Sequence, residues 1–276
     1  MRLFTTKNNS SAPVEQISPW GNFPQGQLSQ WLAAAAWLML WQLCCSLVDL
    51  PLLLPSPGQT ASRLVQLAVT ADFWLTVGAT FSRICSGFFL AAVVGSLLAV
   101  AAAASLWVKT FLYPLFAVLQ ATPVASFTIL ALVWIRSSNL SIFISFIMVL
   151  PMVYRSVLAG IKSADRQLLE MGRAFRFSWW KKVRFLYLPA VLPFFVSACT
   201  TGIGFAWKSG IAAEVLGIPA RAVGSEIYQA KIYLETADLF AWTIVVIFIS
   251  IVLERLFVWA MGRLKVCLLR YGGSKL

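Results

Sequence analysis

Long apolar runs alternate with short polar segments along this chain. Six runs are long enough, or nearly so, to cross the hydrocarbon core of a bilayer, which needs about 20 residues of helix. We predict helical spans at roughly 30–54, 82–106, 111–135, 140–160, 188–210 and 239–261. Proline and glycine inside these runs do not exclude helix, because neighbouring helices can satisfy the freed backbone groups. The pattern predicts an all-α polytopic membrane protein with about six transmembrane helices.

The segment 55–81 needs a separate interpretation, because prolines and a glycine near its start end the first run. Beyond them, apolar residues recur at the spacing of one helix face. These residues are Leu64, Leu67, Ala68, Ala71 and Leu75. We predict an amphipathic helix that lies at the membrane interface, rather than a further span.

Composition agrees with a membrane protein. Hydrophobic residues make up 60% of the chain and charged residues 12%, which is about half the charged fraction of a soluble domain. The net charge of +12 could suit nucleic acid, but the charges lie in short segments between apolar runs, so we exclude that partner. The five cysteines are odd in number and form no CxxC, which argues against a disulfide framework or a zinc site. Histidine is absent, so we expect neither a catalytic site nor a metal or other cofactor.

The distribution of lysine and arginine predicts the orientation, because cytoplasmic loops are enriched in both. With the N-terminus inside, the cytoplasmic segments are 1–29, 107–110, 161–187 and 262–276, and the most basic is 161–187. Most of the acidic residues then fall on the opposite side. We therefore expect both termini to be cytoplasmic, with segment 1–29 before the first span and its external linker (30–69), and a tail at 266–276.

The most informative stretch is 161–193, which reads IKSADRQLLEMGRAFRFSWWKKVRFLYLPAVLP. Asp165 or Ser163 can cap a helix start, and Ser178 can cap a second short helix. Pro189 marks the entry into the next span. We predict two short helices, joined by a turn near Arg176–Phe177, that lie across the cytoplasmic face and suit docking onto a partner.

This stretch resembles the EAA loop of bacterial ABC importer permeases of the binding-protein-dependent type. That loop reads approximately E-A-A-x-x-x-G, then about nine residues, then an apolar residue, one more residue and a Leu-Pro pair. Glu170 falls on the family's glutamate, Met171 and Gly172 on its two alanines, and Leu188–Pro189 on its Leu-Pro. The family's glycine falls on Arg176. A glycine there implies a left-handed turn, which costs another residue about 1–2 kcal/mol. Either the turn differs in this chain or its strain is tolerated.

The resemblance covers roughly 70–265. FSRICSGFFLAAVVGSLLAV (81–100) is similar to the start of the family's permease core, and YPLFAVLQATPVASFTILALVW (113–134) to its next span. GIGFAWKSGIAAEVLG (202–217) resembles the family segment A-W-x-x-x-V-x-A-E-M-x-G, which points to the nitrate, sulfonate and taurine branch.

The resemblance implies a type I, MetI-like importer fold with cytoplasmic coupling helices in the cell membrane. Two permease copies, most simply a homodimer surrounded by lipid, would form the pathway. A separate ABC ATPase subunit would receive the coupling loop 161–187, and an external substrate-binding protein would deliver the solute. The chain has no G-x-x-x-x-G-K-[ST] motif, so ATP should be hydrolysed on the partner and this chain should not be an enzyme.

Two groups of residues are candidates for these functions. The resemblance and the loop suggest that the ATPase-coupling residues are Asp165, Leu169, Glu170, Gly172, Arg173, Arg176, Trp179 and Trp180. The candidates for the solute pathway are Gln120, Thr122, Pro123, Trp207, Lys208 and Glu214. Simpler roles compete: basic residues that set topology, tryptophans that anchor at the interface, and polar contacts between helices. A lysine inside a span should face a pathway or a partner, so Lys208 could attract an anion.

Two other functions stay open at this point. An ion-coupled secondary transporter would need carboxylates within the membrane and inverted repeats, and a non-transporting scaffold would use the loop to bind a regulatory protein. Nitrate, alkyl sulfonates, taurine, bicarbonate and small heterocycles all remain candidate solutes.

Overall fold

The computed structural model describes residues 27–48, 50 and 52–273, and this part of the chain is helical without strands. Residues 1–49 and 50–276 form two units. The first contains α1 (Gln27–Val48), whose segment Trp31–Val48 is long and apolar enough to cross a membrane. The predicted cytoplasmic segment 1–29 lies almost wholly outside the described residues, as does the end of the predicted tail 266–276.

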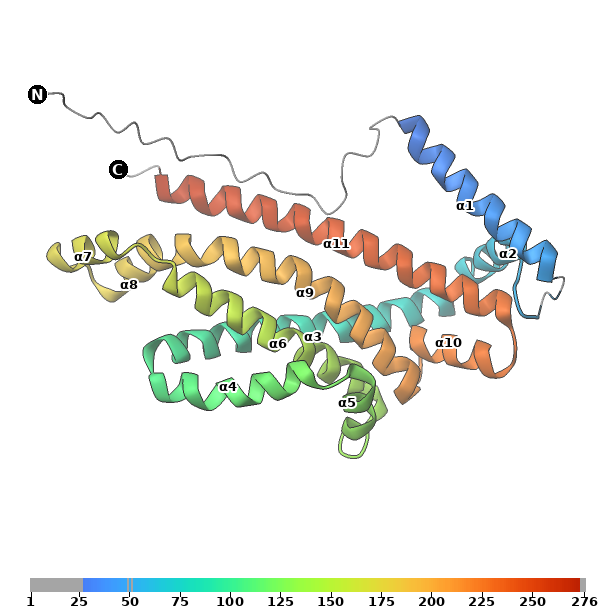
Figure 1. Cartoon of the computed structure of the whole chain (residues 1–276), viewed down its shortest axis with the longest axis horizontal. Coiled ribbons are helices and arrows are strands. Elements are labelled where there is room, and N and C mark those ends of the chain that lie inside the picture. Colours follow the sequence, from blue (N-terminus) through green and yellow to red (C-terminus); the bar gives the residue numbers. More distant parts are fainter. Residues whose placement is uncertain (1–26, 49, 51, 274–276) are drawn as a thin grey trace, which may run out of the picture. The chain divides into compact units, whose positions relative to one another are not determined.

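Three long helices form the core of the second unit: α3 (Ala71–Ala104), α6 (Ser137–Lys162) and α9 (Leu188–Gly217) (Figure 1). α6 packs extensively against both of the others. Small residues permit this close packing, as they do in other membrane bundles. A Cβ added at Gly87 of α3 would lie 2.3 Å from the Ile142 carbonyl oxygen, and one at Gly210 of α9 would lie 2.6 Å from the side chains of Ile84 and Ser145.

The span predicted at 111–135 is bent instead of straight. α4 (Leu106–Ala121) and α5 (Val124–Ala131) meet at an angle of 106°. Thr122 adopts an extended backbone, and Pro123 begins α5. Proline disfavours the helical conformation of the residue before it and offers no N–H for the helix ladder, so the break falls at this pair. Five helices of the described residues could cross a membrane, or six if α4 and α5 count as one span.

The helix predicted within 55–81 is divided. α2 (Pro57–Ala68) starts with a reciprocal capping box between Ser56 and Gln59. Its apolar residues Leu64 and Leu67 pack against the core, and the interfacial position of this helix stays a prediction. Thr70 then caps a new helix, so Ala71 and Leu75 belong to α3. The apolar pattern continues across this boundary, which explains why periodicity alone missed it.

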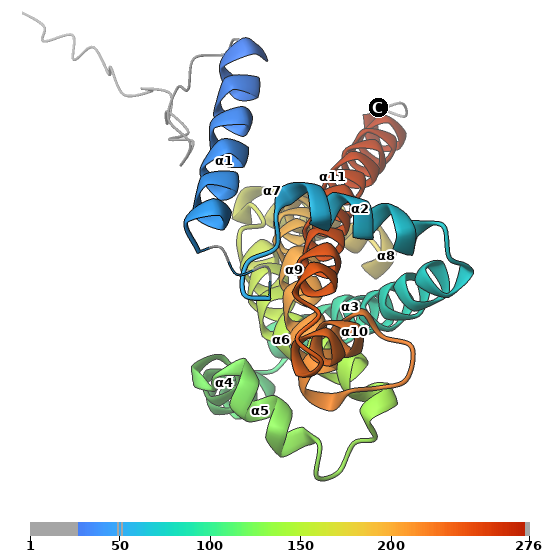
Figure 2. The ribbon, with the colours of Figure 1, turned by 90° about the vertical axis from the view of Figure 1, so that its right-hand side faces the viewer.

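The remaining helices lie at the two ends of the bundle. α7 (Arg166–Ala174) and α8 (Trp179–Lys182) lie at one end, which we call the α7–α8 end (Figure 1). α10 (Val223–Ile232) lies at the opposite end against α9 and the start of α11 (Thr236–Gly273), and we call this the α10 end (Figure 2). α2 packs against α11 at the same end. Sequence analysis had not predicted α10, which is too short to span a bilayer.

Candidate functional site

The first candidate region is α7. The backbone N–H of Gln167 donates to Asp165 Oδ1 at 2.8 Å, which confirms one of the two helix starts that the sequence predicted. Gly172 is buried and Leu169 is half-buried. An apolar stripe on another side, made of Leu168, Met171 and Phe175, is 47%, 42% and 73% exposed. Because these three residues are separated by three and four positions, they share one helix face.

The turn after α7 answers the question that Arg176 raised. Its φ is 50°, in the left-handed region. The Arg176 N–H donates to the Arg173 carbonyl at 3.0 Å, and the Phe177 N–H donates to the Gly172 carbonyl at 2.9 Å. These two bonds are the Schellman pattern, in which glycine is the usual left-handed residue. The turn is therefore the one that a glycine would make, and its strain is tolerated.

Gly172 sets how closely the two arms of this turn approach. A Cβ added there would lie 2.9 Å from Leu186 Cδ1 and 3.6 Å from Phe177 Cδ2. Leu186 belongs to the segment that leads into α9, so the missing side chain of Gly172 lets α7 pack directly against that segment.

We had predicted that the second short helix ends before the next span, but the structure shows no such end. α8 continues through a π-helical turn, η1 (Val183–Tyr187), directly into α9. The Leu188 N–H donates to the Val183 carbonyl, five residues back. Pro189 does not interrupt this path, because it falls in the first turn of α9 and the wider π turn precedes it. Pro193 lies inside α9, which continues past it. α8, η1 and α9 are therefore one continuous helical rod.

The other predicted coupling residues face solvent in this chain. Trp179 and Trp180 are 66% and 79% exposed, and Glu170, Arg173 and Arg176 are exposed as well. In the part of the chain that the structure describes, none of these charged side chains forms an ion pair. Their polar and aromatic groups are available to a partner.

Glu214, a predicted pathway residue, lies at the α10 end and is completely buried. Its Oε2 accepts from Thr80 Oγ1 at 2.8 Å and from the Gly224 N–H at 3.4 Å. Arg83 Nη1 lies 3.6 Å from Oε1. The carboxylate therefore ties α9 to α3 and to the start of α10.

Arg83 extends the same network to the loop between α9 and α10. Its guanidinium donates to the carbonyl oxygens of Ala220 and Arg221, both at 3.1 Å. Ile218 and Arg221 in this loop have left-handed backbones, with φ of 46° and 50°. The hydrogen bonds from Arg83 thus connect the Glu214 network to this strained loop.

The other pathway candidates fall in different surroundings. Trp207 is fully buried, and its Nε1 donates to the Val246 carbonyl of α11 at 3.1 Å. Lys208, the next residue of α9, is exposed. Gln120 and Pro123 are exposed beside the α4–α5 break, and the Thr122 hydroxyl there donates to the Val118 carbonyl at 2.8 Å.

A second ion pair at the α10 end was not predicted from the sequence. Arg63 of α2 binds Asp238 of α11 through both Nε and Nη2, the latter at 2.9 Å. This bond raises the pKa of Arg63. Burial raises the pKa of Glu226 nearby, and the negative charges of Asp72 and Asp238 raise it further. The sequence signal was weak, because Arg63 and Asp238 lie 175 positions apart.

Comparison with known proteins shows the family of this chain. The family model described as "Binding-protein-dependent transport system inner membrane component" matches residues 91–265, which is more than half of the chain. The chain belongs to this family. The matched region of this permease includes α7, α8 and α9. The Schellman turn after α7 and the continuous helix from α8 to α9 therefore lie within the family domain.

Several curated permeases are similar to this one. The taurine transport system permease protein TauC of Escherichia coli (strain K12) is 25% identical over 85% of this chain and 87% of its own length. The putative aliphatic sulfonates transport permease protein SsuC of Bacillus subtilis (strain 168) is 26% identical over 80% of each. The bicarbonate transport system permease protein CmpB of Synechococcus elongatus is 24% identical over 92% of this chain and 95% of its own.

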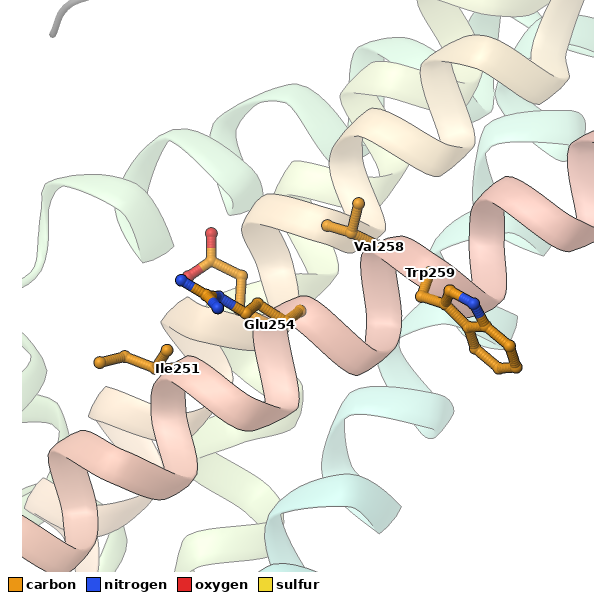
Figure 3. A pocket seen from close by; sticks show the side chains of 5 residues that line it. Ile251, Glu254, Val258 and Trp259 are labelled. Atoms are coloured by element: carbon orange, nitrogen blue, oxygen red, sulfur yellow. The ribbon is translucent and has the colours of Figure 1, made fainter. Parts of the chain in front are cut away.

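A shallow hollow on the permease lies on α11 (Figure 3). Its lining residues all come from one face of this helix, and they are Ile251, Glu254, Arg255, Val258 and Trp259. Because a single helix forms the hollow, it is an open surface and not an enclosed solute cavity. Sequence analysis gave no role to Glu254 and Arg255, although charges inside a span are a signal in themselves.

Proposed function

We propose that this chain is the membrane-spanning subunit of an ATP-driven importer for small anions, and that the segment 161–187 docks onto a separate ATPase. The observation that carries this proposal is the apolar stripe of Leu168, Met171 and Phe175. It is 42–73% exposed on a helix that lies between two membrane spans, outside both of them. An exposed apolar surface outside the bilayer favours a protein partner.

The construction of this region suits it to transmit force. The Schellman turn at Arg176 and the close approach of Gly172 to Leu186 connect α7 to η1. η1 continues into α9, which packs against α3 and α6. A displacement of α7 by the ATPase would therefore move α9 and the bundle. ATP needs only to bind one arrangement of the ATPase better than the other to shift the permease between two states.

The coupling candidates divide into two kinds. Asp165, Leu169 and Gly172 shape α7 and its packing, since they cap it or face the chain. Glu170, Arg173, Arg176, Trp179 and Trp180 face outward and are the proposed contacts with the ATPase.

The names of the relatives support an anionic solute. They concern taurine, aliphatic sulfonates and bicarbonate, whose common feature is an anionic sulfonate or carbonate group. The family description supports an external binding protein that delivers the solute. The basic residues of 161–187 support cytoplasmic termini, and a second copy of this chain would complete the pathway.

An ion-coupled secondary transporter is less well supported. It would need a carboxylate that can bind and release an ion during transport. Glu214 is buried and held by Thr80, Gly224 and Arg83, so its position favours a fixed structural role. The family match also favours an importer that works with partner subunits.

The test is retention of the ATPase by single variants of the stripe. The permease and its ATPase are expressed together, and the complex is captured through a tag on the permease. We expect Met171→Asp and Phe175→Asp each to reduce ATPase recovery at least tenfold, because an acid cannot enter an apolar contact without a large desolvation cost. Ile232→Asp, at an apolar residue that is 56% exposed at the α10 end, is the matched control.

Two results would contradict the proposal. One is undiminished ATPase recovery and uptake in both stripe variants. The other is solute uptake by the wild-type complex in proteoliposomes that follows an ion gradient and continues without ATP.

A further inference from the structure

α9 carries two charged residues, Lys208 and Glu214, which differ in burial and in ion pairing. Glu214 is fully buried and paired. Lys208 is six positions away, about 120° around the helix, and it is exposed. Within the described residues Lys208 takes part in no ion pair. The ammonium group of Lys208 is therefore available to water, a ligand or an opposite charge that does not belong to the described part of this chain.

Lys208 belongs to an exposed stripe along α9. Its members follow one another at spacings of four and three residues, and they are Thr201, Phe205, Lys208 and Ala212. Gly204 lies one turn before Lys208, and a Cβ added there would meet nothing within 4 Å. Phe205 is 43% exposed. Space is therefore available around the ammonium group.

Depth along the helix argues that this stripe is not covered by lipid. Nine residues separate Lys208 from Gly217, so the lysine lies about 13 Å along the axis from the end of α9. An unpaired ammonium at such a depth is costly in hydrocarbon and is expected to face water, a ligand or an opposite charge.

A carboxylate of a second copy does not match this depth. In the described spans of this chain, the acidic residues beyond the first turns are Glu214 and Glu254. Glu214 is already paired. Glu254 lies 18 residues into α11, about 27 Å from the α10 end, which is about twice the depth of Lys208. Two copies related by an axis normal to the membrane keep equal depths, so Glu254 of one copy would not reach Lys208 of the other.

We propose that Lys208 binds the anionic group of the solute, a sulfonate, carboxylate or small oxyanion, on a water-filled face of α9. The ammonium group supplies the positive charge, and the open surface beside Gly204 and Phe205 supplies the room. This inference rests on the proposed function, because a solute reaches this face only if the chain forms a transport pathway. It assigns Lys208 to selection of the solute by charge.

The experiment measures the local charge without a known solute. A reporter thiol is introduced by Phe205→Cys in the complete complex, with the native cysteines replaced. Its rates of reaction with an anionic reagent, 2-sulfonatoethyl methanethiosulfonate, and a cationic one, 2-trimethylammonioethyl methanethiosulfonate, are compared. Phe205 and Lys208 are helix neighbours three positions apart, about 6 Å from each other. A unit charge at about 6 Å in water changes each rate by about threefold. We expect Lys208→Gln to lower the anionic-to-cationic rate ratio about tenfold.

Three further variants complete the design. Lys208→Arg keeps the charge and should keep the ratio. Lys231→Gln removes one positive charge from an exposed position on α10 and should leave the ratio unchanged. Thr201→Cys, two turns away on the same stripe, serves as a second reporter if the Phe205→Cys complex does not assemble.

A ratio that changes less than twofold in Lys208→Gln would overturn the inference. So would a reporter that reacts with neither reagent in an assembled complex, since protein or lipid would then cover the stripe. The proposed importer function fails in a different assay, namely when the wild-type complex takes up no solute on addition of ATP. The two failures are therefore distinguishable.

Discussion

The two ends of the helical bundle satisfy their charges differently. At the α10 end, Glu214 is paired with Arg83 and Arg63 with Asp238, and these ion pairs join α9 to α3 and α2 to α11. The Gly224 N–H connects α10 to Glu214. At the α7–α8 end, the charged residues of α7 and α8 face solvent without ion pairs among the described residues. Apolar side chains such as Phe175 and Trp180 are exposed beside them. The α10 end also exposes apolar residues, which are Ile232, Tyr233 and Leu234. The two ends therefore differ in how their charges are paired and not in whether apolar surface is exposed.

Backbone strain in the loop between α9 and α10 is also supported differently from strain in the turn after α7. Ile218 and Arg221 have left-handed backbones at the α10 end, and Arg83 binds the carbonyls of their loop. Arg176 has the same conformation at the α7–α8 end, where only the two Schellman bonds of its own turn support it. The strained loop between α9 and α10 is therefore held by a residue distant in sequence, whereas the turn at Arg176 is held locally. Leu234, with φ of 57° at the end of α10, is held by a local turn of the same kind as Arg176. The difference predicts that substitutions at the α10 end affect stability and that those at the α7–α8 end affect partner binding.

The strongest test of this comparison is Glu214→Ala against Glu170→Ala. Removing one member of a buried ion pair leaves an uncompensated charge and costs about 3–5 kcal/mol. Because Arg83 is partly exposed and can be solvated, we expect a loss near the lower limit, about 3 kcal/mol. Glu170 is exposed, so Glu170→Ala should leave the stability of the isolated permease unchanged while it weakens ATPase recovery.

Equilibrium unfolding of the purified permease in mixed detergent micelles measures both free energies. The comparison would be broken if Glu214→Ala cost less than about 1 kcal/mol, because the network would then not hold the α10 end. A large loss of stability in Glu170→Ala would contradict the other half.

Local patterns predicted the elements of this protein better than their connections. Apolar periodicity identified the spans, and the loop sequence identified Asp165 as a helix cap and Arg176 as a turn. Apolar periodicity did not separate α2 from α3 at Thr70, because apolar residues continue across that boundary. It also missed the continuity of α8 with α9, since Pro189 resembles a helix break until its place in the first turn is known.

For the candidate sites too, the sequence predicted local groups of residues but not contacts between residues that are far apart in the chain. The coupling residues lie within one short segment, so sequence spacing brought them together. Glu214 was a pathway candidate from the sequence, but its burial depends on Thr80, which lies 134 positions away. The pairing of Arg63 with Asp238 likewise depends on how α2 meets α11. Pairings over such separations are products of the tertiary fold and leave no local pattern.

A smaller effect is expected for Arg63→Gln. The bidentate geometry favours this ion pair, but Arg63 is 40% exposed and water screens its charge. We expect a loss of about 1 kcal/mol in the same unfolding measurement, with the loss reduced in high salt. Arg173→Gln, at an unpaired arginine of α7, should change stability by less than this. Equal losses for the two variants would remove the distinction between the ends.

The smallest effect is expected for Arg176→Gly, which restores the residue that the left-handed turn favours. The left-handed backbone costs a non-glycine residue about 1–2 kcal/mol, and the greater freedom of glycine in the unfolded chain cancels about 0.5–1 kcal/mol of the gain. The net stabilisation should lie between about 0 and 1.5 kcal/mol. Arg176→Ala keeps the Cβ and its strain, so it should give no gain. If Arg176 contacts the ATPase, both variants will lower ATPase recovery while only the glycine raises stability. A gain in both would show that the charge, and not the backbone, is the unfavourable feature of this turn.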